Sequence, residues 1–158
     1  MKQIEKASGI GGMLTTFRKL VRGRKKITFI GCLGWCNPFA ELLGYVLRDA
    51  GKEMVFIPNL RKDLAAKVKM TVYGMQIDEK ADPSADTVVL LGGLAMPKME
   101  VDASGLNAMI EEITRGHPDP QILGVCIGGV FQKAGWEKLI DFDYLMDADM
   151  EVVTYGFK

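Results

Sequence analysis

The chain has 158 residues, of which 48% are hydrophobic and 25% are charged, as in an ordinary globular protein. Twenty basic residues balance twenty acidic ones, so no overall field attracts nucleic acid or an anionic membrane surface. No apolar stretch approaches the roughly 20 residues that span a bilayer, and residues 1–6 lack the features of a signal peptide. Three cysteines, an odd number, argue against a disulfide framework. We therefore expect a single cytoplasmic α/β domain over residues 1–158, without a nucleic-acid or membrane partner.

Residues 1–25 are expected to form an N-terminal helix and a linker. Apolar residues recur with helical spacing from Met13 to Val21, which predicts an amphipathic helix. This helix would pack on the outside of the domain or against a second subunit, so a homodimer is one expected assembly. The basic run Arg22–Lys26 is expected to be a solvated linker.

Four short β-branched runs that are apolar on both faces predict buried strands. They lie at residues 27–30, 54–57, 87–91 and 122–126. Helical spacing predicts helices over residues 39–47 and 106–113, and a weaker helical stripe lies at residues 64–68.

The remaining segments predict the edges of the sheet. Residues 73–85 are expected to form an extra edge strand and a loop, and residues 144–146 a final parallel strand. Residues 152–155 predict an edge strand or hairpin, after turn residues at 147–149. Because strand and helix alternate, we predict a three-layer, doubly wound, mainly parallel fold of about five to seven strands. Rossmann-like, flavodoxin-like and amidotransferase-like arrangements all fit this pattern.

Glycines and all three cysteines fall directly after three of the predicted strands. In an open α/β sheet the carboxyl ends of the strands meet at one edge, where ligands bind at the topological switch point. We therefore predict that this edge binds a small anionic ligand, such as a nucleotide or a phosphorylated or carboxylated metabolite. The expected ligand-binding residues are Gly31, Gly34, Cys36, Asn37, Gly92, Gly93, Lys98, Gly128 and Gly129.

The first of these loops predicts where the anion would lie. Asn37 followed by Pro38 is typical of a helix start, in which Asn caps backbone N–H groups and Pro occupies the first turn. The helix N-terminus would carry partial positive charge toward the site, with Lys98 as a counter-charge. Leu33 stands where a dinucleotide fingerprint needs glycine, so the cofactor stays unknown and the glycines could equally serve a tight turn. Trp35 is expected either to cover a ligand or to pack on the sheet edge.

The cysteines leave three interpretations open. The first is simple packing, since free cysteines are among the most buried residues. The second is a reactive thiol, because Cys36 lies immediately before a helix N-terminus, which favours the thiolate. The third is a zinc or iron–sulfur site formed by Cys32, Cys36 and Cys126, although Cys-x3-Cys with one distant cysteine is not a specific metal motif.

Residues 122–129, Ile-Leu-Gly-Val-Cys-Ile-Gly-Gly, resemble the nucleophile elbow of class I glutamine amidotransferases. The resemblance implies that Cys126 is a catalytic nucleophile. That family also needs a histidine after the elbow, whereas the sole histidine, His117, precedes the fourth strand. A thiol enzyme would therefore need an acidic base such as Glu41 or Asp149. Because acid–base groups are scarce at the predicted edge, we expect ligand binding rather than catalysis.

Several motifs resemble one family over nearly the whole chain. They are Pro38–Leu43, Leu91–Lys98, Gly135-Trp136 and Asp147–Met150. By these motifs the chain is similar to an uncharacterised family of small proteins from methanogenic archaea. The resemblance implies an archaeal cytoplasmic protein and assigns no activity to any residue.

Overall fold

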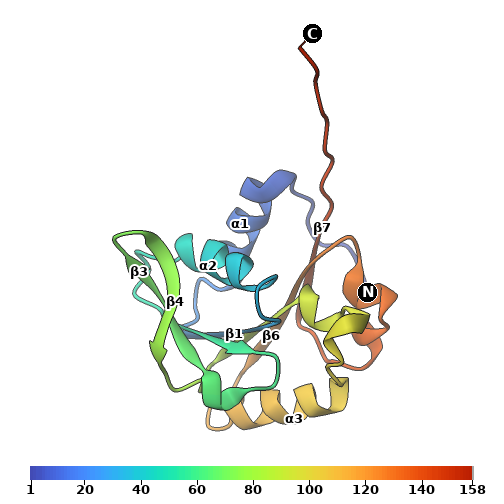
Figure 1. Cartoon of the computed structure of the whole chain (residues 1–158). Coiled ribbons are helices and arrows are strands. Elements are labelled where there is room, and N and C mark those ends of the chain that lie inside the picture. The colour runs from blue at the N-terminus through green and yellow to red at the C-terminus, as the bar shows by residue number, and fades with distance from the viewer. Residues whose placement is uncertain (158) are drawn as a thin grey trace.

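The sheet lies at the centre of the molecule, between two layers of helices (Figure 1). The computed structural model describes residues 1–157, and within them seven strands form one sheet in the order β4-β3-β2-β1-β5-β6-β7. The strands are β1 (Lys26–Gly31), β2 (Glu53–Pro58), β3 (Ala66–Thr71), β4 (Gly74–Lys80), β5 (Thr87–Leu91), β6 (Gln121–Ile127) and β7 (Tyr144–Ala148).

Five neighbouring strands are parallel. β1 pairs with β2 and β5, β5 with β6, and β6 with β7, all in parallel. β3 runs antiparallel to β2, and β4 runs antiparallel to β3 at the sheet edge. Counted among themselves, the parallel strands follow the order 2-1-3-4-5 of flavodoxin-like sheets, whose switch point lies between the first and third strands. The mainly parallel, doubly wound fold is thus confirmed, and its switch point falls between β1 and β5.

The helices are divided between the two faces of the sheet (Figure 1). α1 (Gly9–Leu20) and α2 (Asn37–Tyr45) pack on one face, and α3 (Ala103–Thr114) and the short α4 (Val130–Lys133) on the other. Within β1 alone, Phe29 belongs to the first core and Ile30 to the second. This alternation explains why the strand is apolar on both faces, since each face is covered by helices.

α1 packs into the core of its own chain. Phe17 is fully buried and its ring centroid lies 6.1 Å from that of Phe29. Met13 is also buried, whereas Ile10, earlier in the same helix, is 48% exposed. The amphipathic pattern therefore faces the sheet, and Phe17 is not available for contact with a second subunit. Among residues 1–157, no helix has the length and apolar character needed to cross a membrane.

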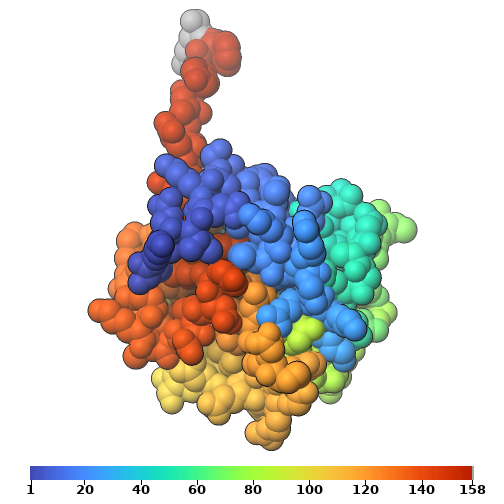
Figure 2. Space-filling view, turned by 180° about the vertical axis from the view of Figure 1, so that it is seen from behind, coloured from blue at the N-terminus to red at the C-terminus, as the bar shows by residue number. Residues whose placement is uncertain are grey.

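Two predicted elements differ in the structure. The stripe at residues 64–68 is not a helix, because Leu64 is 48% exposed and the chain enters strand β3 at Ala66, where Val68 is buried. Residues 152–155 do not form an edge strand or hairpin, because the chain leaves the sheet after β7. They continue as an exposed extension away from the body of the molecule (Figures 1 and 2). The edge strand expected within residues 73–85 is present as β4.

Candidate functional site

The loops that follow β1, β5 and β6 meet around two glycines at the carboxyl edge of the sheet. A Cβ atom on Gly93 would lie 2.5 Å from the sulfurs of both Cys32 and Cys36. A Cβ atom on Gly92 would lie 2.6 Å from the Cβ of Cys126. Both distances are too short for any side chain, so this close approach of three loops requires glycine at both positions. The diglycine lies between the Cys32–Cys36 pair and Cys126.

A cavity of about 250 Å³ opens beside the diglycine. Its wall combines the ends of β5 and β6 with residues from α1, α2 and the β1–α2 loop. The lining residues are Met13, Trp35, Cys36, Phe39, Leu91, Gly92, Gly93, Met96, Val125, Cys126, Ile127 and Val130. Within the described chain, none of these is a charged residue, so the cavity is apolar apart from glycine backbone and two thiols. Trp35 is 64% exposed and forms part of this wall, so it lies at the boundary between cavity and solvent.

The first loop differs from the predicted helix cap. α2 begins at Asn37, and Cys36 occupies the cap position. The Asn37 side chain turns back, and its Oδ1 accepts a hydrogen bond of 3.2 Å from the N–H of Gly34. Gly34 has a φ of 78°, which glycine adopts without strain. The amide therefore closes the loop and does not cap the helix, while Pro38 occupies the first turn as predicted.

Cys32 and Cys36 form a close pair. Their sulfurs are 3.2 Å apart, with one thiol donating to the other, and the N–H of Cys36 donates to the carbonyl of Cys32 across one turn. Burial, reinforced by the neighbouring Cys32 thiol, raises the pKa of Cys36 to about 12. The prediction that the helix N-terminus would favour a Cys36 thiolate is therefore wrong, because burial outweighs it.

Cys126 lies at the turn between β6 and α4. Gly128 and Gly129 follow it with φ values of 67° and 69°, so the chain reverses sharply, as the resemblance to a nucleophile elbow implies. Interaction with the backbone N–H groups of Phe131 and Val130 acts to lower the pKa of the Cys126 thiol. Burial nevertheless raises the pKa of Cys126 to about 12, and the carboxylate of Asp147 adds to this effect.

Asp147 connects the elbow to β7. Its Oδ1 accepts hydrogen bonds from the Cys126 thiol at 3.4 Å and from the N–H of Gly129 at 2.9 Å. Its Oδ2 lies 3.5 Å from the donating Nε2 of Gln132. Asp147 was expected to be a turn residue, but it belongs to β7 and pairs directly with Cys126 in the register of β6 and β7. Asp147, and not Glu41 or Asp149, is the acidic group in contact with Cys126.

Of the nine expected ligand-binding residues, only Cys36, Gly92 and Gly93 line the cavity. The other six do not; they are Gly31, Gly34, Asn37, Lys98, Gly128 and Gly129. Lys98 belongs to an exposed turn at Pro97–Met99 and does not line the wall. His117 lies before β6, at the opposite edge of the sheet as expected, but it is half-buried and its Nε2 is 3.2 Å from Ser84 Oγ.

The three thiols do not assemble into one metal site. All three cysteines are free and buried, yet within residues 1–157 no group of three or more Cys, His, Asp or Glu side chains is arranged to hold a metal ion. The diglycine separates Cys126 from the other two thiols. A tetrahedral zinc or iron–sulfur site needs at least three protein ligands, which this arrangement does not bring together.

The sequence did not reveal every residue of the wall. Met13, Phe39 and Val130 come from helices, where apolar residues predict core packing and carry no separate signal for a cavity. Asn59, which directly follows β2 at the same edge of the sheet but does not line the cavity, was also missed. It has a φ of 52°, and among the described residues its Oδ1 is buried without a hydrogen-bond partner. Its position directly after a predicted strand was the available signal.

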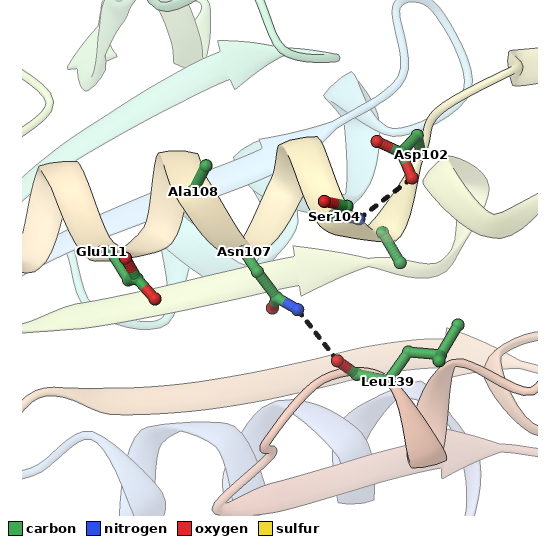
Figure 3. Close-up of a pocket in the computed structure, with 7 residues that line it drawn as sticks. Asp102, Ser104, Asn107, Ala108, Glu111 and Leu139 are labelled. Atoms are coloured by element: carbon green, nitrogen blue, oxygen red, sulfur yellow. Dashed lines mark hydrogen bonds between the residues drawn. The ribbon is translucent and has the colours of Figure 1, made fainter.

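A second hollow, of about 470 Å³, lies along α3 on the other face of the sheet (Figure 3). Two of its polar side chains, Asp102 and Asn107, have structural partners. The Asp102 carboxylate accepts hydrogen bonds from the N–H groups of Ser104 and Gly105 at the start of α3. Asn107 Nδ2 donates to the carbonyl of Leu139, 2.9 Å away. These contacts cap the helix and connect it to the segment at Leu139.

Comparison with known proteins shows to which family this chain belongs. Residues 8–151 match the family described as "Uncharacterized protein conserved in archaea (DUF2124)". An uncharacterised protein of Methanocaldococcus jannaschii is 40% identical over 158 residues, covering 98% of this chain and 94% of the relative. An uncharacterised protein of Methanothermobacter thermautotrophicus is 35% identical over 151 residues, with 96% of each chain covered. The crystal structure of a protein of unknown function from Methanothermobacter thermautotrophicus has a TM-score of 0.91 at 33% identity, covering 99% of both chains. The chain therefore belongs to this archaeal family, as its motifs implied.

Proposed function

We propose that this protein binds a small organic molecule with a mainly apolar skeleton in the cavity at the carboxyl edge of the sheet. The observation that carries the proposal is the cavity itself, which adjoins the switch point of a doubly wound sheet. Ligands of such folds bind at this position. Its volume of about 250 Å³ is slightly below the usual range of small-molecule sites, which favours a small ligand.

The wall favours an apolar or uncharged ligand over the anion predicted from the glycine loops. Lys98 is exposed outside the wall. Two of the N–H groups expected to bind an anion already have partners: the N–H of Gly34 donates to Asn37, and that of Gly129 donates to Asp147. A buried anion needs compensating charge or hydrogen bonds, and the described wall offers few of either.

A paired ligand screen tests this proposal. Small uncharged compounds and their carboxylated analogues would be compared by thermal shift, with Trp35 fluorescence as a second readout. We expect the uncharged members to raise the melting temperature more. The variant Met96→Trp, which fills the cavity, should lose this protection, whereas Met70→Trp on exposed β3 should retain it. Stronger protection by the carboxylated series, or equal binding by Met96→Trp, would contradict the proposal.

A thiol-dependent reaction at Cys126 is the second candidate, favoured by the contact with Asp147. Because the Cys126 thiol is protonated at neutral pH, it could attack an electrophile only as its proton moves to a base. The Asp147 Oδ1, 3.4 Å from the sulfur, could accept that proton. The N–H groups of Val130 and Phe131 would face negative charge developing near the sulfur.

An acyl-transfer assay tests the second candidate. With p-nitrophenyl acetate, the Cys126 sulfur would attack the carbonyl carbon, nitrophenolate would leave, and the thiol proton would pass to Asp147. Mass spectrometry should then detect one acetyl group on Cys126, none on the corresponding position of Cys126→Ser, and slower acetylation in Asp147→Asn. Acetylation of Asp147→Asn as fast as that of the wild-type protein would exclude Asp147 as the base.

A further inference from the structure

The Cys32–Cys36 pair has features that simple packing does not require. The two sulfurs are 3.2 Å apart, closer than two unlinked sulfur atoms need to be in a packed core. The turn from Cys32 to Cys36 is closed by a backbone hydrogen bond of 3.2 Å, which keeps the two residues one helical turn apart. Such a separation is compatible with the span of a disulfide.

Gly93 and Gly31 make this approach possible. A Cβ atom on Gly93 would lie 2.5 Å from both sulfurs, and one on Gly31 would lie 2.5 Å from the Cβ of Cys36. The backbone of two strand ends therefore surrounds the pair. Burial raises the pKa of Cys36, whereas the backbone N–H of Gly93 acts to lower it, so this N–H would stabilise a thiolate formed during a reaction.

Access to the pair is restricted to the cavity. Cys32 and Cys36 are 0% and 1% exposed, but Cys36 lines the cavity whereas Cys32 does not. A reagent that enters would thus meet the Cys36 sulfur first, with Cys32 directly behind it. This is the arrangement of an attacking thiol and a resolving thiol.

We propose that Cys32 and Cys36 form a redox-active dithiol that reduces a small-molecule disulfide admitted by the cavity. The Cys36 thiolate attacks one sulfur of the disulfide, forming a mixed disulfide and releasing one thiol. The Cys32 thiolate then attacks the Cys36 sulfur and releases the second thiol. The two cysteine protons pass to the two released thiolates, so that the protein loses two electrons and the small disulfide gains them. This inference uses the cavity of the proposed function but does not depend on the identity of its ligand.

The protonation state of the pair predicts how the reaction depends on pH. Burial, together with the Cys32 thiol, raises the pKa of Cys36 to about 12, so little thiolate exists at neutral pH. The exchange rate should therefore rise about tenfold for each pH unit through the alkaline range, because the thiolate is the attacking form. A high thiol pKa also makes the Cys36 thiolate intrinsically more nucleophilic, which partly offsets its scarcity.

The test uses bis(2-hydroxyethyl) disulfide, a small uncharged disulfide, with the fully reduced protein under anaerobic conditions. We expect the three free thiols to fall to one, the protein mass to decrease by about 2 Da, and two small thiols to be released per chain. Met70→Trp, at an exposed position of β3 outside the cavity wall, should give the same mass change and the same two released thiols. Peptide mapping should place the new bond between Cys32 and Cys36.

Single variants separate the two steps. Cys32→Ser should stop at the mixed disulfide on Cys36, with a gain in mass and one released thiol. Cys36→Ser should lose the reaction. If a variant fails to fold, as judged by circular dichroism, phenylarsine oxide provides a second measurement. This trivalent arsenical binds two neighbouring thiols, so it should add one phenylarsenic group to the wild-type protein, with its oxygen leaving as water.

Three results would overturn the proposal: a wild-type protein that keeps all three thiols, a bond that includes Cys126, or no arsenical adduct on the wild-type protein. The outcome is independent of the ligand screen. Disulfide formation without ligand binding would count against the proposed function alone. Ligand binding to a protein whose thiols do not react would count against the dithiol alone.

Discussion

Asp147 and Cys126 face each other across the parallel pairing of β6 and β7, and the carboxylate Oδ1 lies 3.4 Å from the thiol sulfur. The same oxygen accepts the N–H of Gly129, so one side chain joins the elbow to the edge strand. The contact has two opposite chemical consequences. Asp147 disfavours the resting thiolate, because like charges repel, yet it provides a proton acceptor at the moment of attack.

We predict that Asp147→Asn will speed the alkylation of Cys126 by iodoacetamide. Burial is the main reason that the pKa of this thiol is about 12, but the Asp147 charge and hydrogen bond raise it further. Removing the charge should lower the pKa. At pH 8 to 9 the alkylation runs through thiolate that is already formed, and not through proton transfer to Asp147 as in the acetylation, so its rate should rise by up to roughly tenfold for each unit of decrease. Alkylation followed by mass spectrometry measures this rate. Asp149→Asn, two residues later, is the matched control and should behave as the wild-type protein; an unchanged rate in Asp147→Asn would refute the electrostatic coupling.

We expect Gly93→Ala to destabilise the fold by about 1–3 kcal/mol. The new methyl group would lie 2.5 Å from the sulfurs of Cys32 and Cys36, so the core must shift to admit it. Urea unfolding measures the loss. Adding Cys36→Ala should recover part of it, because one clashing sulfur is removed. Gly11→Ala on the exposed side of α1, where a methyl group meets open space, should instead stabilise by about 0.5–1 kcal/mol. A loss in Gly93→Ala that Cys36→Ala does not relieve would contradict the contact.

Phe17→Ala should cost about 3–5 kcal/mol of unfolding free energy. Phe17 is fully buried and packs against Phe29, so its removal leaves a cavity between α1 and the sheet. Ile10→Ala, on the exposed side of the same helix, should change stability by less than about 0.5 kcal/mol. Chemical denaturation of both variants provides the comparison. Equal effects would mean that α1 does not pack on the sheet as described.

The Asp102 cap predicts a loss of stability in acid. Hydrogen bonds from the N–H groups of Gly105 and Ser104 lower the pKa of Asp102 below its ordinary value of 3.8. A depressed pKa in the folded state contributes stability above the ordinary value, and this contribution is lost as the pH falls through the folded value. Asp102→Asn should therefore show a smaller drop in urea midpoint between pH 6 and pH 3 than the wild-type protein. Ser104→Ala keeps its backbone N–H and should retain the wild-type response.

The strands and the meeting of the loops could be predicted from residue pattern and topology together. The four β-branched runs became β1, β2, β5 and β6, because buried parallel strands need apolar residues on both faces. The meeting of the glycine loops could be predicted because parallel strands run in the same direction and therefore have their carboxyl ends at the same edge of the sheet.

The chemistry of the site could not be predicted in the same way. Asn37 and Pro38 have the residue types of a helix start. The Asn37 side chain instead accepts a hydrogen bond from the N–H of Gly34, and this contact depends on the geometry of the loop. Asp147 resembles a turn residue because a second aspartate follows two positions later. Its role as the partner of Cys126 appears only once β7 pairs with β6. Burial of the thiols likewise depends on tertiary packing, and it reverses the pKa direction expected for Cys36.

The residues of the cavity wall come from distant parts of the chain, from Met13 in α1 to Val130 in α4. A ligand that contacts all of them would shift the equilibrium toward the folded state. No smaller folding unit contains the whole wall, so a bound molecule would hold α1, both glycine loops and the elbow together as one cooperative structure. A ligand present at 100 times its Kd would add about 2.7 kcal/mol to the unfolding free energy. Amide hydrogen exchange would then slow about 100-fold both in α1 and around Cys126. These segments are more than 100 residues apart in the sequence.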